Sequence, residues 1–550
     1  MMQSSLPGVL DAVPVRSLTV VVTVAVVLVG VRRLAGERLT TALRRRLLLG
    51  VPWGTLLTTV GVLAIYLFVQ GAWWHSRPLV TPFRTWSYFY PLGMLTGAFT
   101  HGGDAHITGN LLGTVAYGTV VEYAWGHYPR SRGSQTFSSP STNPFARILA
   151  VPAAMTVVGV FSGLFAVGPV VGFSGVVFAL AGFALVTRPF LFLGALLGSR
   201  VVEQVYRALL FPQPTVGGSA RFVTPWWANI AIQGHAVGLL AGVVSGAVFL
   251  WARRERPATT RVFFATLVFG VSNGLWAVYV PVGGGRFTLF RWLGTALVFV
   301  LALLVAAATA RMDRGLLPTF ERDWQSIAGL ALVVAFGALC LASVPANTAA
   351  IGPDDVPADG VEVRDYVVTY DENVRNEYVA GISLPFDLAG DRTNVTESGV
   401  IVASDDREIW IVQVQKGQLA LNQRASVVVG GPGWRETVYA NRTGWNVLGN
   451  KTIYRVQLRR EGGERRTVFT SPPSTADTTI GGRNVTFRPD DDGFMIAVRR
   501  GNATVDVDRM PPNATARTIG GLRFERNRTR LYAGVNDTRV KIAEQRQPPK

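Results

Sequence analysis

The chain has 550 residues, of which 49% are apolar, and a formal net charge of +18. Only nine of its 35 acidic residues precede residue 347: Asp11, Glu37, Asp104, Glu122, Glu203, Glu255, Asp313, Glu321 and Asp323. The other 26 leave the tail close to neutral, so the positive excess falls in short loops between apolar runs. That pattern is typical of membrane flanks and argues against nucleic-acid binding. The single cysteine, Cys340, excludes a disulfide framework and a thiolate metal site.

Apolar runs before residue 347 are long enough to cross a bilayer. The first is followed by Arg32 and Arg33 and has no small-residue cleavage site, so we expect a retained span rather than a signal peptide. An aromatic segment that reaches Thr100 is too irregular for a plain span. We predict ten spans, at residues 17–31, 53–73, 106–125, 148–167, 174–186, 190–210, 229–251, 262–280, 290–310 and 327–344.

Arginine-rich loops follow every second predicted span. They contain Arg32, Arg33, Arg38, Arg44, Arg45 and Arg46; Arg130, Arg132 and Arg147; Arg188; Arg253, Arg254, Arg256 and Arg261; and Arg311, Arg314 and Arg322. The positive-inside rule places these loops in the cytoplasm. The N-terminus and the tail are therefore predicted to lie outside.

The tail from residue 347 carries eight Asn-x-Thr triplets, which are candidate glycosylation sites on an exported face. They begin at Asn394, Asn441, Asn450, Asn484, Asn502, Asn513, Asn527 and Asn536. Tail segments such as residues 361–369, 400–415 and 452–458 alternate or are rich in β-branched residues between turn residues, which predicts an all-β domain.

The apolar run at residues 171–180 contains Gly172-Phe173-Ser174-Gly175. The glycines would let another backbone come close and leave the Ser174 hydroxyl uncovered. By itself this motif is weak, because serine and glycine are common packing residues in membrane helices. Ser174 would begin a helix, where unpaired N–H groups and the helix dipole favour an oxyanion.

His235 stands in a predicted span, where an ionisable side chain usually marks function. Gly238 and Gly242 follow at helical spacing on the same face, so another helix can pack within hydrogen-bond range of the imidazole. Ser174 and His235 both begin inward-running spans and therefore lie at matched depth. A serine and a histidine so placed can form a nucleophile–base dyad. The alternative is a polar packing residue in a glycine-rich interface.

His106 and Asn110, four residues apart, share a helix face at the start of a third inward-running span. Both can donate hydrogen bonds to a developing oxyanion. A metal site built from His101, Asp104 and His106 is the alternative, but this spacing matches no common zinc signature.

Together these motifs resemble the rhomboid family of intramembrane serine proteases over residues 53–253. His106-x-x-x-Asn110, within Phe99-x-His101-Gly102-Gly103, looks like the family's oxyanion motif. Gly172-x-Ser174-Gly175 looks like its nucleophile motif, and His235-x-x-Gly238-x-x-x-Gly242 like that of its base. The resemblance implies that Ser174 attacks the scissile carbonyl of a transmembrane substrate. His235 would take the proton, and His106, Asn110 and the Ser174 amide would hold the oxyanion.

The sequence departs from the family at two places. Phe178 stands where family members often have a tyrosine that stacks on the histidine, and Leu92-Gly93 replaces a common Trp-Arg pair in the first external loop. A rhomboid-like pseudoprotease that binds or dislocates transmembrane clients is the leading alternative, although such proteins usually lose one of these residues. A transporter would be expected to carry more charges within its spans.

We therefore predict an all-α polytopic membrane protein, with a rhomboid-like six-helix core, about four extra spans and a C-terminal all-β soluble domain. The predicted parts are 1–50, an extra span and basic loop; 51–256, the protease core; 257–346, three further spans; and 347–550, the extracytoplasmic β domain. We expect the protein to lie in a lipid bilayer, to act on transmembrane proteins as substrates, and to need no cofactor or metal. Arginine outnumbers lysine, of which there are four, and this favours an archaeal source.

Overall fold

The computed structural model describes residues 26, 29–30, 33, 38–128, 137, 139–210, 231–255, 258–281, 287–310, 324–380, 396–449 and 451–545. These residues divide into two compact units, the first of which ends at Asn347 while the second continues from Thr348. The predicted first span, at residues 17–31, lies almost wholly outside the described residues, as do the candidate glycosylation sites Asn394 and Asn450.

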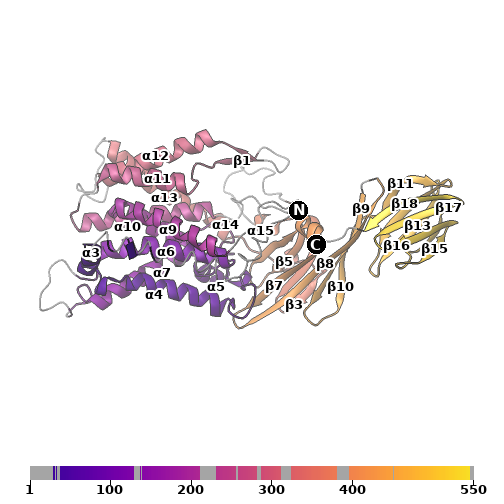
Figure 1. Ribbon diagram of the computed structural model, residues 1–550, viewed down its shortest axis with the longest axis horizontal. Coiled ribbons are helices and arrows are strands. Elements are labelled where there is room, and N and C mark those ends of the chain that lie inside the picture. The colour runs from indigo at the N-terminus through magenta and orange to yellow at the C-terminus, as the bar shows by residue number, and fades with distance from the viewer. Residues whose placement is uncertain are drawn as a thin grey trace, which may run out of the picture. The chain divides into compact units, whose positions relative to one another are not determined.

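The first unit is helical (Figure 1). Its main helices are α3 (Arg38–Arg46), α4 (Trp53–Ala64), α5 (Pro91–Thr96), α6 (Asp104–Trp125), α7 (Pro144–Leu164), α8 (Ser174–Thr187), α9 (Pro189–Leu210), α10 (Ile232–Ala252), α11 (Thr259–Ser272), α12 (Arg291–Ala310), α13 (Trp324–Leu341) and α14 (Val344–Asn347). Short turns complete it: η1 (Leu48–Gly50), η2 (Ile65–Val69), η3 (Thr81–Phe83) and η4 (Gly97–Phe99). The irregular segment that precedes Thr100 is thus built from η3, α5 and η4.

Four described helices are long and apolar enough to cross a membrane, namely α7, α10, α12 and the segment Trp324–Asn347. Shorter apolar helices cover Trp53–Val69, Ser174–Thr187 and Thr259–Ser272. Together with the sequence, these helices make the chain a multi-pass membrane protein.

One predicted span is too long. The run 262–280 was expected to be a single helix, but α11 ends at Ser272, and residues 279–281 form strand β1 (Tyr279–Pro281) paired with β2 (Phe287–Leu289). Gly274 adopts a φ of 68°, the left-handed conformation that ends helices, and Pro281 cannot continue one.

Helix α8 lies at the centre of the helical unit. Eleven of its fourteen residues are buried, and it packs against α6, α7 and α10. The contact with α10 is unusually close because glycines face backbone: a Cβ at Gly242 would lie 1.9 Å from the Ala179 carbonyl oxygen, and one at Gly182 would lie 2.2 Å from that of Leu239. Close glycine-mediated packing gives van der Waals contact where lipid offers no hydrophobic drive.

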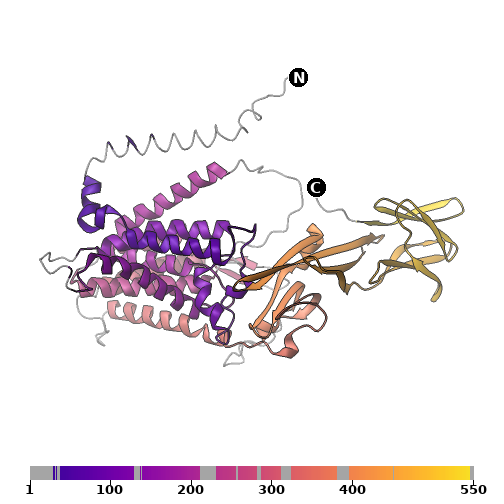
Figure 2. The same cartoon turned by 90° about the horizontal axis from the view of Figure 1, so that it is seen from below.

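The second unit is built almost entirely of antiparallel strands (Figure 2), as expected from the alternating tail segments. One four-stranded sheet contains β3 (Val361–Val363), β4 (Tyr366–Arg375), β5 (Thr396–Ser404) and β6 (Ile409–Gln415). A second contains β11 (Ser474–Ile480), β12 (Arg483–Pro489), β13 (Phe494–Arg500) and β14 (Ala503–Arg509). A short helix, η6 (Pro353–Asp355), precedes β3, and two others, α15 (Glu377–Ala380) and α16 (Lys416–Asn422), lie between strands.

The largest sheet of this unit has eight strands. They are β7 (Arg424–Gly431), β8 (Trp434–Val447), β9 (Lys451–Arg460), β10 (Arg465–Thr470), β15 (Ala516–Ile519), β16 (Leu522–Asn527), β17 (Arg530–Val535) and β18 (Thr538–Gln545). The long strand β8 pairs with β7 through its first half and with β18 near its end. It therefore connects strands β7, β9 and β10 with strands β15–β18 in one sheet. The fold class predicted from the sequence, a helical membrane protein with a C-terminal β domain, is confirmed.

Candidate active site

Ser174 and His235 form a direct hydrogen-bonded pair. The His235 Nε2 and Ser174 Oγ atoms are 2.7 Å apart, although 61 residues separate them in the chain. Ser174 is the first residue of α8, and His235 lies in the first turn of α10. This distance is within the range that a general base needs to take a proton from a nucleophilic hydroxyl.

The His235 ring is held from the side by Phe178, one turn along α8 from Ser174. The two rings stack with centroids 4.3 Å apart and planes 10° apart. Phe178 also meets Phe269 of α11 edge to face at 5.5 Å. Parallel stacking fixes the imidazole plane without any hydroxyl group, so Phe178 can orient the ring.

Glycines make the Ser174–His235 contact possible. A Cβ at Gly238, one turn after His235, would lie 2.2 Å from the carbonyl oxygen of Gly175, next to Ser174. A Cβ at Gly175 would lie 2.8 Å from the Ser162 side chain on α7. Any larger residue at either position would force the helices apart.

His106 and Asn110 lie beside the backbone that leads into Ser174. Gly172 has a φ of 120°, and a Cβ on it would be 2.6 Å from the His106 Nε2 and 3.4 Å from the Asn110 Nδ2. The Gly102 N–H donates to the His106 Nδ1 at 3.4 Å, so the ring hydrogen of a neutral His106 lies on Nε2 and faces Gly172. The Asn110 Nδ2 is buried without a hydrogen-bond partner. The His106 Nε2 and the Asn110 Nδ2 thus both lie beside Gly172 as hydrogen-bond donors, and the Asn110 Nδ2 has no acceptor there.

His101 supports the same loop from behind. It is fully buried, and its Nε2 accepts a long, 3.4 Å hydrogen bond from the N–H of Phe173, the residue before Ser174. The Gln70 side chain bonds both the N–H and the carbonyl of His101, at 2.8 and 2.9 Å. Asp104 accepts a hydrogen bond from Tyr66 at 2.6 Å. No three His, Cys, Asp or Glu side chains in the described part of the chain are arranged to hold a metal ion.

A small cavity of about 20 Å³ adjoins the pair, and Gly97, Ser162, Gly172, Ser174 and His235 are among its lining residues. Its size corresponds to about one water molecule.

Comparison with known protein families matches residues 88–252 to the Rhomboid domain. The chain therefore contains a rhomboid domain. Comparison with curated proteins and with solved structures gives no match.

The first loop of the rhomboid domain is held without the Trp-Arg pair common in the family. Gly93 packs directly on the Arg84 backbone, where a Cβ would lie 1.9 Å from the carbonyl oxygen. The Arg84 side chain bonds the Pro169 carbonyl at 3.3 Å, and the Thr85 hydroxyl bonds that of Gly168 at 2.9 Å. This loop therefore braces the segment that leads to Ser174.

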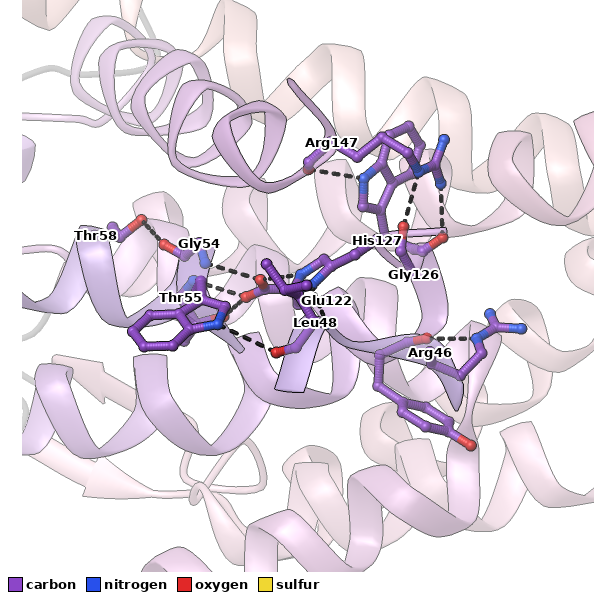
Figure 3. Close-up of polar contacts among 12 residues, drawn as sticks. Arg46, Leu48, Gly54, Thr55, Thr58, Glu122, Gly126, His127 and Arg147 are labelled. Atoms are coloured by element: carbon purple, nitrogen blue, oxygen red, sulfur yellow. Dashed lines mark hydrogen bonds and ion pairs between the residues drawn. The ribbon is translucent and has the colours of Figure 1, made fainter. Parts of the chain in front are cut away.

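A second polar centre lies at the other end of α6 (Figure 3). Glu122 is fully buried and accepts hydrogen bonds from the Gly54 N–H, the Thr55 N–H and the Thr55 hydroxyl at 2.7–2.8 Å. The Leu48 N–H donates to the His127 Nδ1, so we assign the His127 hydrogen to Nε2, which lies 2.6 Å from Glu122. This network fixes the start of α4 to the end of α6.

Residues beyond the matched domain also reach the loop before Ser174. The Asn347 side chain is fully buried and donates to the carbonyls of Leu164 and Ala166 at 3.1 and 2.9 Å. The Gln233 Nε2 donates at 2.7 Å to the carbonyls of both Phe165 and Leu339 of α13. Its Oε1 accepts from the Val167 N–H at 3.0 Å.

Sequence reasoning missed Glu122, Gln233 and Asn347. Glu122 could have been found, because a carboxylate inside a predicted span is rare and usually functional or structural. Gln233 and Asn347 are ordinary polar residues near predicted span ends, where water would satisfy them equally well, so their sequence context carries no signal.

Proposed function

We propose that the rhomboid domain is an intramembrane serine protease that cleaves peptide bonds of transmembrane proteins with a Ser174–His235 dyad. The observation that carries this proposal is the 2.7 Å contact between the Ser174 hydroxyl and the His235 Nε2, made at helix starts within a membrane protein. The match of residues 88–252 to the Rhomboid domain supports it.

In this mechanism His235 takes the Ser174 proton as Oγ attacks the scissile carbonyl carbon. The resulting tetrahedral intermediate collapses when His235 returns that proton to the leaving amine, and an acyl-enzyme remains. A water molecule, deprotonated by His235, then attacks the ester carbonyl carbon, and His235 returns that proton to the Ser174 Oγ as the C–O bond breaks and the carboxylic acid product leaves. Phe178 keeps the imidazole in one plane through both proton transfers.

The oxyanion of each intermediate is stabilised by His106, Asn110 and the Ser174 N–H. The orphaned Asn110 Nδ2 supports this role, because a buried donor without an acceptor is costly unless a ligand supplies one. The Ser174 N–H is at a helix N-terminus, so it has no partner within α8 and adds the helix dipole.

The decisive test is labelling of the purified full chain with a serine-directed fluorophosphonate, together with cleavage of a model transmembrane substrate. We expect wild type to label and cleave, and Ser174→Ala and His235→Ala to do neither. Ser245→Ala is the matched control on α10, because the Ser245 hydroxyl bonds only the preceding turn at 2.7 Å. Equal labelling of wild type and Ser174→Ala would overturn the dyad. A folded wild type that binds the substrate but neither labels nor cleaves would favour the pseudoprotease.

We also propose that the four predicted parts stand as divided above and that the N-terminus and β domain are outside the cell membrane. Asn502, Asn513, Asn527 and Asn536 support this orientation as candidate glycosylation sites, because all four are exposed on the β domain. Protease added to intact cells should digest the β domain. Protection of that domain would contradict the ten-span topology.

A further inference from the structure

A long apolar groove runs between α7 and α10, with α8 as its floor. Its volume is about 500 Å³, within the range of ligand sites. Ala154 and Met155 of α7 form one wall, Ala241 and Val248 of α10 form the other, and Phe183 is on the floor. The small alanines keep the groove open.

The lining offers no polar group that needs a partner. The Ser245 hydroxyl is bonded within α10, and the Trp125 Nε1 donates to the Arg147 carbonyl at 3.0 Å. All other lining side chains are apolar. The occupant of the groove must therefore be apolar along its length.

One end of the groove is positively charged. There the rings of Trp125 and Phe249 carry the guanidinium groups of Arg147 and Arg253, each 4.2 Å from a ring centroid. Arg147 and Arg253 both donate to the Trp125 carbonyl, at 2.9 and 2.7 Å, and Arg147 also bonds that of Gly126 (Figure 3). Arg254, next along the chain, is exposed.

The dimensions of the groove match one leaflet of a bilayer. On α10 the lining runs from Ala241 to Ala252, about 16 Å at the rise of an α-helix, which is about half the hydrocarbon thickness. Arg253 is 18 residues beyond His235, about 27 Å along the axis, so it lies near the opposite membrane surface from the dyad. Basic groups at that level attract anionic lipid head groups.

We propose that this groove binds an anionic glycerophospholipid. One acyl chain fills the groove over α8, and the phosphate lies against Arg253 in the positive field of Arg147 and Arg254. This site is independent of the proposed protease activity. It would close the gap between α7 and α10 with hydrocarbon that neither helix supplies.

The test is native mass spectrometry of the delipidated full chain titrated with dioleoyl phosphatidylglycerol, with dioleoyl phosphatidylcholine and with glycerol phosphate alone. We expect tightest binding of phosphatidylglycerol and none of glycerol phosphate. Ala154→Phe should weaken phosphatidylglycerol binding by about tenfold, because the ring displaces buried chain methylenes. Ala153→Phe is the matched control, because its neighbouring position is also exposed but does not line the groove.

Charge variants test the head group separately. Arg253→Gln and Arg254→Gln should each reduce the preference for phosphatidylglycerol over phosphatidylcholine by about fivefold. Arg254→Gln covers the case in which loss of the Arg253 bonds unfolds the helix end. The proposal would be overturned if Ala154→Phe and Ala153→Phe bound phosphatidylglycerol equally well. It would also be overturned by equal affinity of wild type for the two lipids, or by binding of glycerol phosphate alone. So would a protein helix, rather than lipid, that copurifies with wild type and is lost in Ala154→Phe.

Discussion

Phe178 and His235 stack face to face, with ring centroids 4.3 Å apart and planes inclined by 10°. The contact depends on ring shape alone, so removal of the ring should free the imidazole to rotate. We expect Phe178→Ala to lower kcat by about tenfold to 100-fold, as misplacement of a catalytic group does. Phe178→Tyr should keep most of the activity, since the stacking surface is unchanged. Cleavage kinetics on one transmembrane substrate will decide, and full activity of Phe178→Ala would contradict the orienting role.

Asn110 is predicted to act on the transition state rather than on substrate binding. Asn110→Asp keeps the shape of the side chain but removes its N–H donors, so kcat should fall by about 10²- to 10³-fold with little change in KM. Asn273→Asp is the control, since that side chain donates to the Phe269 carbonyl and accepts from the Arg200 guanidinium, and neither bond involves Ser174 or His235. A larger effect on KM than on kcat would place Asn110 in substrate binding instead.

The crossing of α8 and α10 requires glycine at position 242. A methyl group there would lie 1.9 Å from the Ala179 carbonyl, so Gly242→Ala should destabilise the protein by about 1–3 kcal/mol through overpacking. Gly194→Ala on α9 is the control, because nothing lies within 4 Å of its added methyl, and helix propensity favours alanine. Thermal unfolding in detergent measures the difference. Equal melting temperatures would mean that the helices can shift apart at no cost.

Asn347 should affect catalysis although it is outside the matched domain. Asn347→Leu removes the donors to the carbonyls of Leu164 and Ala166. The Tyr88 hydroxyl still donates to Leu164 at 2.8 Å, so the Ala166 carbonyl is the one that loses its partner, at a cost of about 1–3 kcal/mol. We expect faster hydrogen exchange at residues 164–167 and a lower kcat. Ser343→Ala is the control, since its buried hydroxyl bonds only the Cys340 carbonyl in the same turn. Normal exchange and activity in Asn347→Leu would show that the loop holds its shape unaided.

The β domain has an acid-sensitive contact at Glu372. Burial alone would raise the pKa of this carboxyl, but hydrogen bonds from Lys416, Tyr370 and Tyr454 outweigh it and lower the pKa below its usual value of 4.5. A lowered folded-state pKa contributes stability above pH 4.5 that is lost as the pH falls through the folded value. Wild type should therefore lose β-domain stability below about pH 4.5, and Glu372→Gln should lose less over that range. Denaturant unfolding of the full chain at several pH values, followed by Trp fluorescence, measures how steeply the free energy of unfolding falls with pH in wild type and in Glu372→Gln.

Side-chain types and helical spacing were enough to predict that Ser174 and His235 lie within hydrogen-bond range of each other. Ser174 and His235 are scarce residue types in apolar runs at matched depth, and each is next to glycines. The same reasoning predicts His106 and Asn110 as oxyanion donors, whereas the supporting position of His101 was predicted from the family resemblance. The end of α11 at Ser272 was missed because Asn273 and Gly274 stand inside an otherwise apolar run, where hydropathy outweighs one turn signal.

Long-range polar contacts could not be predicted. Glu122 meets Thr55 across 67 residues, and Asn347 meets Ala166 across 181. Such pairs depend on how helices rotate about their axes, and a span of nearly uniform hydrophobicity, such as α8, gives no preferred face. The rotation follows instead from glycine positions and from the polar groups themselves.

The bonds made by Asn347 show that the matched domain is shorter than the stretch of chain that holds the segment before Ser174 in place. The match to the Rhomboid domain ends at residue 252. Asn347, which bonds the carbonyls of Leu164 and Ala166 in the segment before Ser174, lies 95 residues further along the chain. A fragment cut at the end of the recognisable region would leave the carbonyls of Leu164 and Ala166 without these donors, and its inactivity would be read wrongly as evidence against the dyad. Expression trials, chimaeras and comparisons of activity among relatives should therefore keep the chain intact at least through α14.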